Sequence, residues 1–331
     1  MQDDHETGMF FAAFDADLEH FFSTDTIFCD ACYDEFATLW PRVHEENINE
    51  GLGASISHDA FYARSRMKGG YSKAEYDDYT RSMECPRCGN LIGPSMRLCL
   101  LPPSVDASFE QTIKEMAELA RRTPFLLLSH PFAQKVHATL RELGAALEPV
   151  QIQGGLWRGR EGVSESDAGL LASYDRPPED RVQEGRYNHA GSPVLYLSSD
   201  RTTCHSELRD RACTAGELRF DTPLRVLDLV ALWDAHPSHA EALEPLAYSA
   251  LLSAKQPDSG FQRPHYVFSR FVADCARDAA IQAIKYPSTR ITAGNYNLVI
   301  LDPEVRLEEV AVLEQWVRLP QKDADNERRK P

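Results

Sequence analysis

Apolar residues recur at helical spacing in the stretch between residues 102 and 148. The first run places five of them on one face of a helix: Phe109, Ile113, Met116, Leu119 and Ala120. A second run with the same period extends from Phe132 to Leu143, and Pro124 separates the two because proline interrupts a helix. We therefore expect residues 102–148 to form a helical connector.

After residue 148 the helical runs give way to a mixture of short apolar runs and helical periods. Four short runs predict strands: Gln151 to Arg158, Pro193 to Ser198, Leu224 to Leu229 and Leu298 to Leu301. One predicted helix is capped by Ser199 or Asp200 and runs through Arg211, and another extends from Val267 to Ala280. This order is typical of neither a Rossmann domain nor a barrel, so we expect residues 149–318 to form an α+β domain.

The two ends of the chain differ from these segments in composition. Residues 1–101 are acidic and rich in aromatic side chains, and we expect them to form a separate small domain of this 331-residue chain. Residues 319–331 are polar and highly charged, which predicts a disordered tail. Apolar residues make up 43% of the chain, enough for a sizeable core, so the rest should be globular.

The cysteines predict a metal site in the first domain. Cys29 and Cys32 form one Cys-x-x-Cys pair, and Cys85 and Cys88 form the other. Four thiolates of this kind are a ligand set for one tetrahedral zinc ion, which would stabilise the fold and perform no chemistry because no coordination position stays open. The gap between the pairs is longer than usual, and a helix over residues 71–83 would fill it.

Alternatives to this zinc site stay open at the level of the sequence. The paired cysteines could be redox-active or merely buried thiols, and His20 or Cys99 could replace one of the four ligands. The cysteines outside the pairs are scattered along the chain, so a disulfide framework is not expected.

The charge of the chain excludes some classes of partner. The formal net charge is −16, and residues 1–50 contain 13 acidic residues against a single basic one, Arg42. Such a field repels polyanions, so we expect neither a nucleic acid nor an anionic membrane surface as a partner. The sequence has no apolar run long enough to span a bilayer and no secretory pattern, which predicts a cytoplasmic protein.

Three separated stretches form an unusual set: LWRGR at 156–160, GRYNHAGSPVLYLSSDRTTCHSELR at 185–209 and YPSTR at 286–290. Each alone has an ordinary explanation. Arg158 and Arg186 could be surface charges. Glu207 could pair with Arg211 on an exposed helix face, and Ser288 could be a turn residue.

Taken together, the stretches resemble a known family. The order of Arg158, Glu207 and Ser288 resembles the Arg-Glu-Ser signature that names the RES family. Three further motifs extend the resemblance over about residues 150–318: Gly185-Arg186-Tyr187-Asn188, Leu195-Tyr196-Leu197-Ser198 and Gly294-Asn295-Tyr296-Asn297. One position departs from the family pattern, because Arg270 stands where a Gln is often found in the late helix.

The resemblance implies a fold and a reaction. The fold would be an ADP-ribosyltransferase-like split β-sheet with helices, preceded by a small zinc-binding and helical N-terminal domain similar to the extensions of longer RES proteins. Known members consume NAD+ by hydrolysis or phosphorolysis, and some are toxins paired with an antitoxin. NAD+ is therefore the expected substrate. An antitoxin or other regulatory protein and a second copy of the chain are candidate partners.

Cleavage of NAD+ needs the residue types that these motifs supply. The nicotinamide leaves with its electrons and builds positive charge on the ribose, which a carboxylate such as that of Glu207 can offset. Ser288 could position the ribose or Glu207, which makes Arg158, Glu207 and Ser288 the candidate catalytic set. Guanidinium groups bind phosphate in a bidentate way, which suits Arg158 and Arg186 to the pyrophosphate. The other candidate substrate contacts are Tyr187, Tyr196, Arg290 and Asn295.

Three functions remain open on the sequence. The first is an NAD+ glycohydrolase or phosphorylase that depletes NAD+ as a toxin or defence effector. The second is an ADP-ribosyltransferase that modifies a macromolecule, and the third is an inactive, zinc-stabilised binding protein. The intact Arg, Glu and Ser favour an active enzyme.

Overall fold

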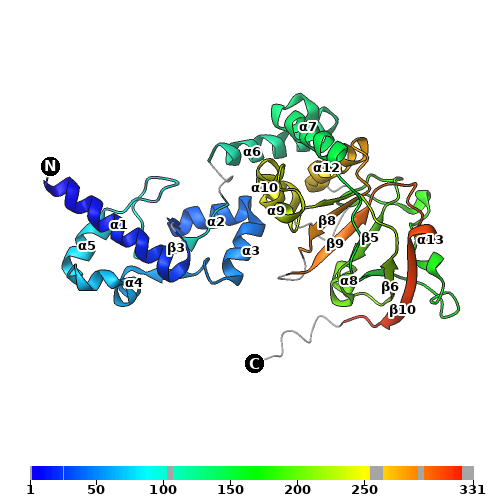
Figure 1. Cartoon of the computed structure of the whole chain (residues 1–331), viewed down its shortest axis with the longest axis horizontal. Coiled ribbons are helices and arrows are strands. Elements are labelled where there is room, and N and C mark those ends of the chain that lie inside the picture. Colours follow the sequence, from blue (N-terminus) through cyan, green and yellow to red (C-terminus); the bar gives the residue numbers. More distant parts are fainter. Residues whose placement is uncertain (1, 25, 103–106, 254–263, 290–293, 323–331) are drawn as a thin grey trace. The chain divides into compact units, whose positions relative to one another are not determined.

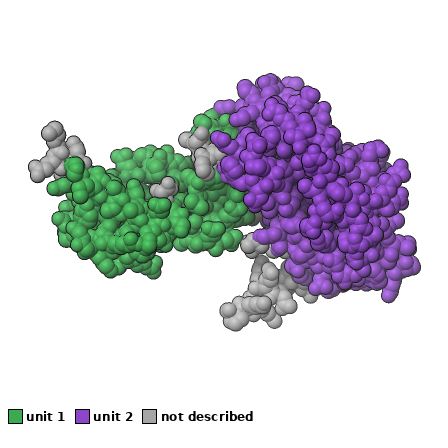
Figure 2. Space-filling model, viewed as in Figure 1, with its two compact units in different colours: residues 1–113, 248–253 green, residues 114–247, 254–331 purple. Residues whose placement is uncertain are grey.

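The structure is a computed structural model that describes the chain except for residues 1, 25, 103–106, 254–263, 290–293 and 323–331. The chain divides into two compact units, which Figure 2 distinguishes by colour. Unit 1 consists of Met1–Ile113 and Tyr248–Ser253, and unit 2 of Lys114–Ala247 and Ala254–Pro331. The domain boundaries expected from the sequence stay predictions. Two further predictions, Arg290 as a substrate contact and the tail beyond residue 322, lie outside the described residues.

Unit 1 combines helices with a small antiparallel sheet (Figure 1). The sheet has the order β1-β3-β2 and is formed by β1 (Thr26–Phe28), β2 (Ser55–Ser57) and β3 (Ser95–Cys99). The helices are α1 (Gln2–Phe22), α2 (Asp30–Leu39), α3 (Pro41–Asn49), α4 (His58–Arg64), η1 (Arg66–Gly69) and α5 (Lys73–Arg81). Aromatic side chains fill its core, among them Phe10, Phe14, Phe61 and Tyr76. The helix predicted over residues 71–83 is present as α5.

The two helical runs in the middle of the chain are present as predicted. They form α6 (Ala107–Arg122) and α7 (Pro131–Ala146). A short 3-10 helix, η2 (Pro124–Ser129), lies between them, with Pro124 in its first turn, where a missing N–H costs nothing.

A seven-stranded mixed sheet forms the centre of unit 2. Its order is β10-β6-β4-β5-β9-β8-β7, and all neighbouring strands are antiparallel except β7 and β8. The strands are β4 (Gly155–Arg160), β5 (Leu195–Ser198), β6 (Cys213–Phe220), β7 (Val226–Asp228), β8 (Ala283–Pro287), β9 (Tyr296–Ile300) and β10 (Ala311–Leu319). Only one residue pair, Trp157 with Ser198, is registered between β4 and β5.

Helices and turns complete unit 2. They are η3 (Leu171–Tyr174), η4 (Glu179–Arg181), α8 (Arg201–Glu207), α9 (Leu232–Ala235), α10 (Ala240–Tyr248), η5 (Pro264–Tyr266), α12 (Val267–Asp278) and α13 (Leu307–Val310); α11 (Ala250–Ser253) belongs to unit 1. The mixture of helices with a mixed sheet confirms the α+β class. Among the described residues, no helix has both the length and the apolar character needed to cross a bilayer.

The alternation of side chains along the central strands decides which residues can form a site. Leu195 and Leu197 of β5 and Leu298 and Ile300 of β9 point into the main hydrophobic core on one face of the sheet. Successive strand residues point to opposite faces, so Ser198 and Asn297 lie on the other face. These two residues are direct register partners, which places their side chains next to each other.

Candidate functional site

Glu207 is the last residue of α8, which follows directly on β5. Asp200 begins this helix as its N-cap, because its carboxylate accepts hydrogen bonds from the backbone N–H groups of Thr202 at 2.7 Å and Thr203 at 3.0 Å. The cap fixes where the helix starts. Glu207 therefore sits two turns beyond the end of β5, one of the central strands.

A glycine lets α8 pack closely on β4. A Cβ atom added to Gly159 would lie 2.4 Å from the Leu208 side chain and 3.1 Å from the sulfur of Cys204. Trp157 and Cys204 belong to one hydrophobic cluster, so the same face of β4 carries the helix. This packing holds the C-terminal end of α8 against the sheet.

The helix ends earlier than the sequence predicts. We expected it to continue through Arg211, but Arg209 and Asp210 adopt positive φ angles of 59° and 54°, which break the helical path after the C-cap residue Leu208. The buried side chain of His205 contacts this turn, because its Nε2 lies 3.1 Å from the carbonyl oxygen of Arg211. Arg211 does not pair with Glu207 in the helical manner considered above; it forms an ion pair with Glu161 at 3.0 Å.

The carboxylate of Glu207 is the centre of a hydrogen-bond network. Its Oε1 accepts from the hydroxyl of Ser288 at 2.9 Å and from the amide Nδ2 of Asn297 at 2.7 Å. The hydroxyl of Ser198 donates in turn to the Oδ1 of Asn297 at 2.8 Å. Glu207 is half-buried, whereas Ser288, Asn297 and Ser198 are buried. The structure thus brings together two of the three predicted catalytic residues, which are 81 positions apart.

The ends of β8 and β9 position Ser288. This residue follows Pro287, the last residue of β8, and its backbone N–H donates to the carbonyl oxygen of Asn295 at 3.1 Å. Asn295 therefore contributes at least a backbone contact, and its role as a substrate contact stays a prediction. The amide that reaches Glu207 belongs to Asn297, which the sequence reasoning did not single out. Its signal was a polar residue inside an otherwise apolar strand, YNLVI.

Arg158 is connected to the same region through β5. Its Nη1 donates to the backbone carbonyl of Tyr196 at 2.9 Å, two residues before Ser198. Its Nε is buried and has no hydrogen-bond partner within the part of the chain that the structure describes. Burial and the nearby charge of Arg160 lower the pKa of Arg158 to about 10, so the group is still charged at neutral pH.

No hydrogen bond or ion pair links Arg158 to Glu207 among the described residues. On β4, Arg158 alternates with Trp157, which packs on the α8 side, so the guanidinium leaves the strand on the other side. The structure therefore joins Glu207 and Ser288 directly and joins Arg158 to them only by way of β5.

Arg186 is enclosed by aromatic rings. Its guanidinium carbon lies 5.3 Å from the ring centre of Tyr266 and 5.6 Å from that of Tyr286, and its Nη2 donates to the Thr289 hydroxyl at 3.1 Å. The hydroxyl of Ser269, on α12, donates to the backbone carbonyl of Arg186 at 2.5 Å. Thr289 follows Ser288 directly, so this second guanidinium is held beside the Glu207 network.

The two predicted tyrosines have structural contacts. Tyr187 is only 1% exposed and its ring centre lies 4.7 Å from that of Tyr286; burial raises its pKa to about 12. The hydroxyl of Tyr196 accepts from the backbone N–H of Tyr187 at 2.9 Å and donates to Asn188 at 3.0 Å. This pair therefore fixes the Gly185-Arg186-Tyr187-Asn188 turn, whatever further contact the rings make with a ligand.

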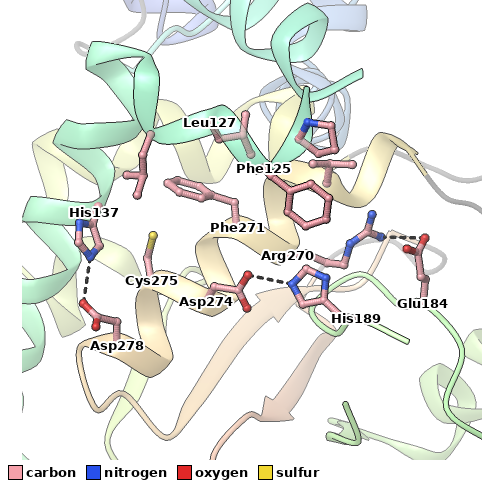
Figure 3. A pocket seen from close by; sticks show the side chains of 13 residues that line it. Phe125, Leu127, His137, Glu184, His189, Arg270, Phe271, Asp274, Cys275 and Asp278 are labelled. Atoms are coloured by element: carbon pink, nitrogen blue, oxygen red, sulfur yellow. Dashed lines mark hydrogen bonds and ion pairs between the residues drawn. The ribbon is translucent and has the colours of Figure 1, made fainter. Parts of the chain in front are cut away.

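A cavity of about 570 Å³ lies elsewhere in unit 2. It is lined mainly by residues of η2 and α12, together with His137 of α7 and with Glu184 and His189 (Figure 3). An ion pair of Arg270 with Glu184 at 3.5 Å lines it, as do two histidine–carboxylate hydrogen bonds, His189 with Asp274 at 2.8 Å and His137 with Asp278 at 2.9 Å. Arg270 is the residue that departs from the RES pattern, and its burial lowers its pKa. None of Glu207, Ser288 and Asn297 lines this cavity, so it is distinct from the network around Glu207.

The four paired cysteines form one cluster in unit 1. The sulfur atoms of Cys29, Cys32, Cys85 and Cys88 all lie within 4.8 Å of one another, and those of Cys29 and Cys88 are 3.9 Å apart. Zinc–sulfur bonds of about 2.3 Å in a tetrahedron place the sulfurs about 3.8 Å apart, so this arrangement fits a metal ion. His20 and Cys99 are not members of the cluster found among the described residues.

Local turns aim the sulfur atoms of each pair at the same point. Cys29 caps α2, and its sulfur accepts from the backbone N–H of Cys32 at 3.4 Å. In the second pair, the Gly89 N–H donates to the Cys85 carbonyl at 2.9 Å, and Gly89 has a φ of 70°, which glycine adopts easily. Arg87 connects the pairs by donating to the Cys32 carbonyl at 3.2 Å.

Comparison with known proteins agrees with the motifs. The family described as RES domain matches residues 156–320, which include all three positions of the Arg-Glu-Ser order. This match confirms the predicted family resemblance for that part of the chain and fits the expected ADP-ribosyltransferase-like fold. A solved structure similar to the chain is titled "Crystal structure of the M.tuberculosis MbcT-MbcA toxin-antitoxin complex"; the identity is 18%, the TM-score is 0.36, and the likeness covers 55% of this chain and 93% of that chain. No curated protein matches the chain.

Proposed function

We propose that the RES domain of this chain cleaves NAD+ at the nicotinamide–ribose bond, with water or phosphate as the acceptor. In this proposal it acts as a toxin or defence effector that depletes NAD+. The observation that supports the proposal most strongly is the carboxylate of Glu207, which is held by hydrogen bonds from Ser288 at 2.9 Å and Asn297 at 2.7 Å. The match of residues 156–320 to the RES domain supports NAD+ as the substrate.

The chemistry needs a fixed negative charge rather than a strong acid. Nicotinamide leaves NAD+ as a neutral base, so the bond breaks without protonation, and positive charge develops on the ribose carbon and ring oxygen. A carboxylate that is already oriented stabilises this oxocarbenium-like state without the cost of reorganisation. Glu207 supplies that charge in our proposal, and its hydrogen-bond donors keep it in one orientation.

The two arginines account for the other end of the substrate. The pyrophosphate of NAD+ carries two negative charges and accepts bidentate hydrogen bonds from guanidinium groups. Arg158 has a buried Nε without a partner among the described residues, and its charge persists at neutral pH because its pKa is about 10. Arg186 is held between Tyr266 and Tyr286.

The decisive test is the release of nicotinamide. We expect the purified protein to convert NAD+ into free nicotinamide, which chromatography detects, together with ADP-ribose in the absence of phosphate or a phosphorylated ADP-ribose in its presence. Absence of NAD+ loss under both conditions would overturn the proposal. Labelled ADP-ribose that appears on a macromolecule, with none released as a small molecule, would instead identify an ADP-ribosyltransferase.

Arg158→Lys is expected to raise the KM for NAD+ about tenfold and to change kcat less. Lysine keeps the charge but cannot form the bidentate contact, and one hydrogen bond to a charged group contributes about 1.5 kcal/mol or more. Steady-state kinetics of nicotinamide release measures both constants. Arg219→Lys is the matched control, because Arg219 is exposed and pairs with Asp221 and Glu314. An unchanged KM in Arg158→Lys would remove Arg158 from substrate binding.

For unit 1 we propose that the four clustered cysteines bind one structural zinc ion. All four positions of a tetrahedron would be taken by thiolates, so the metal would stabilise unit 1 and take no part in the cleavage. An antitoxin or regulatory protein and a second copy of the chain stay as proposed partners.

A further inference from the structure

We propose that Asn297 is a positioning residue for the carboxylate of Glu207, and that Ser198 holds Asn297 in the orientation this needs. The inference rests on the proposed cleavage of NAD+ and adds two residues to its machinery. Neither residue needs to touch the substrate, since both act through Glu207. The juxtaposition that carries the inference is a chain of two hydrogen bonds, from Ser198 to Asn297 and from Asn297 to Glu207.

The chain of hydrogen bonds has a fixed direction. An ionised carboxylate only accepts hydrogen bonds, so Asn297 must present its Nδ2 to Glu207, as it does at 2.7 Å. The amide oxygen then points the opposite way, and the hydroxyl of Ser198 donates to it at 2.8 Å. A flipped amide would set its oxygen against the oxygen of Glu207, which is repulsive. Because Glu207 accepts, Asn297 has to donate through its Nδ2 and accept through its Oδ1, and Ser198 has to donate to that oxygen.

The sheet holds both residues rigidly. Asn297 lies in β9, which pairs with β5 on one side and with β8 on the other, and it is registered with both Ser198 and Tyr286. Ser198 is 5% exposed and Asn297 is 3% exposed, so water has little access to either hydrogen bond. Hydrogen bonds in such a setting keep a defined geometry. Ser288, by contrast, lies beyond the end of β8.

The position of Glu207 explains why it needs this support. It is the last residue of a short helix, where the partial negative charge of the helix end disfavours a carboxylate. After the C-cap residue Leu208, Arg209 and Asp210 turn the chain away from the helix. Two donors on the same oxygen, Oε1, offset the unfavourable position and fix the plane of the carboxylate. Loss of one donor allows other rotamers and lowers the fraction of productive enzyme.

The test is a double-mutant cycle on nicotinamide release with Asn297→Ala, Ser198→Ala and the double variant. We expect Asn297→Ala to lower kcat about tenfold, the size of one hydrogen bond to a charged group, with the KM for NAD+ changed by less than about threefold. Ser198→Ala is expected to lower kcat about threefold. In the Asn297→Ala background the Ser198 substitution should have no further effect, because its target is gone.

Controls separate positioning from loss of stability. Asn47→Ala removes another buried amide, one that bonds Val43 and Leu100 in unit 1, and is expected to keep the kcat of the wild type. Asn297→Asp keeps the shape of the side chain but sets a second carboxylate against Glu207, so it should lose at least as much activity as Asn297→Ala. Thermal unfolding monitored by circular dichroism confirms that each variant is folded at the assay temperature.

The outcomes distinguish this inference from the proposed function. If the wild type releases nicotinamide but folded Asn297→Ala and Asn297→Asp retain its kcat, only the positioning role is wrong. Independent losses that multiply in the double variant would show that Ser198 does not act through Asn297. If the wild type releases no nicotinamide, the proposed function is wrong and the positioning role falls with it.

Discussion

Glu207→Gln is expected to lower the turnover of NAD+ by at least about 10²-fold, because it removes the charge that offsets the developing charge on the ribose. Glutamine has the same shape, and its amide oxygen can still accept from Ser288 and Asn297. The substitution therefore tests the charge rather than the hydrogen-bond network. Nicotinamide release under saturating NAD+ measures the change in kcat.

The expected loss is confined to the chemical step. Glu207 is not assigned to the pyrophosphate, so calorimetry should find that Glu207→Gln still binds NAD+ with an affinity close to that of the wild type. Glu161→Gln is the matched control, since this carboxylate is in the same unit and pairs with Arg211 at 3.0 Å. Near-normal turnover by folded Glu207→Gln would exclude Glu207 as the stabilising group.

The Arg-Glu-Ser order of Arg158, Glu207 and Ser288 predicted more of the site than any one of these residues did alone. Glu207 ends α8 and Ser288 follows β8, yet their side chains are hydrogen-bonded at 2.9 Å. Taken singly, each had a more ordinary explanation, and the helical pairing of Glu207 with Arg211 proved wrong because the helix ends at Glu207. The sequence has no local signal for the end of this helix. The two residues with left-handed backbone angles are Arg209 and Asp210, whereas glycine is the usual residue at such a position.

Asn297 shows what a sequence pattern leaves undetermined. The two asparagines of the Gly-Asn-Tyr-Asn motif are two positions apart, so the alternation of side chains along a strand would put both on the same face. Alternation alone therefore does not predict which of Asn295 and Asn297 contacts Glu207. Their difference depends on the register between β9 and β5, which sets Asn297 opposite Ser198. Register is fixed by tertiary pairing of strands that are about 100 residues apart, and the sequence carries no local sign of it.

The position of the Arg158 side chain was likewise only partly predictable from the sequence. The apolar run predicted a strand that includes Arg158, and β4 is that strand, but it is joined to β5 by a single registered pair, Trp157 with Ser198. The side on which the guanidinium lies follows from the packing of α8 over Trp157 and Gly159. Such packing depends on the helix as much as on the strand, so it could be read only from the structure.

The cysteine pairs could be recognised in the sequence because the two cysteines of each pair lie in one short turn. A Cys-x-x-Cys turn directs two sulfur atoms to one point, and the pairs need only meet. The contact between the pairs is tertiary: Arg87 donates to the Cys32 carbonyl and forms ion pairs with Glu110 at 2.5 Å and Glu35 at 3.3 Å. Arg87 and Glu110 are largely buried, and the contacts of Arg87 hold the second pair against the first.

Cys85→Ser is expected to release the metal from unit 1 and to destabilise this unit severely. Cys85 is 1% exposed, and its replacement leaves three thiolates and a poor fourth ligand at the centre of the cluster. Structural zinc contributes about 10 kcal/mol or more to small domains, so the loss of even part of it should lower the unfolding temperature of unit 1 by more than about 10 °C. Atomic emission spectroscopy should find about one zinc per chain in the wild type and far less in the variant.

Cys99→Ala is the matched control, because Cys99 is fully buried in the same unit but outside the cluster. It should retain the metal and lose only the small stability expected for a buried thiol. The same comparison decides between a zinc site and the redox-active thiols that the sequence left open. Redox-active thiols would react with a thiol reagent without releasing any metal, and the unfolding temperature of Cys85→Ser would then resemble that of Cys99→Ala. If the wild type contains no metal when purified from a zinc-sufficient culture, the sulfur cluster has another role.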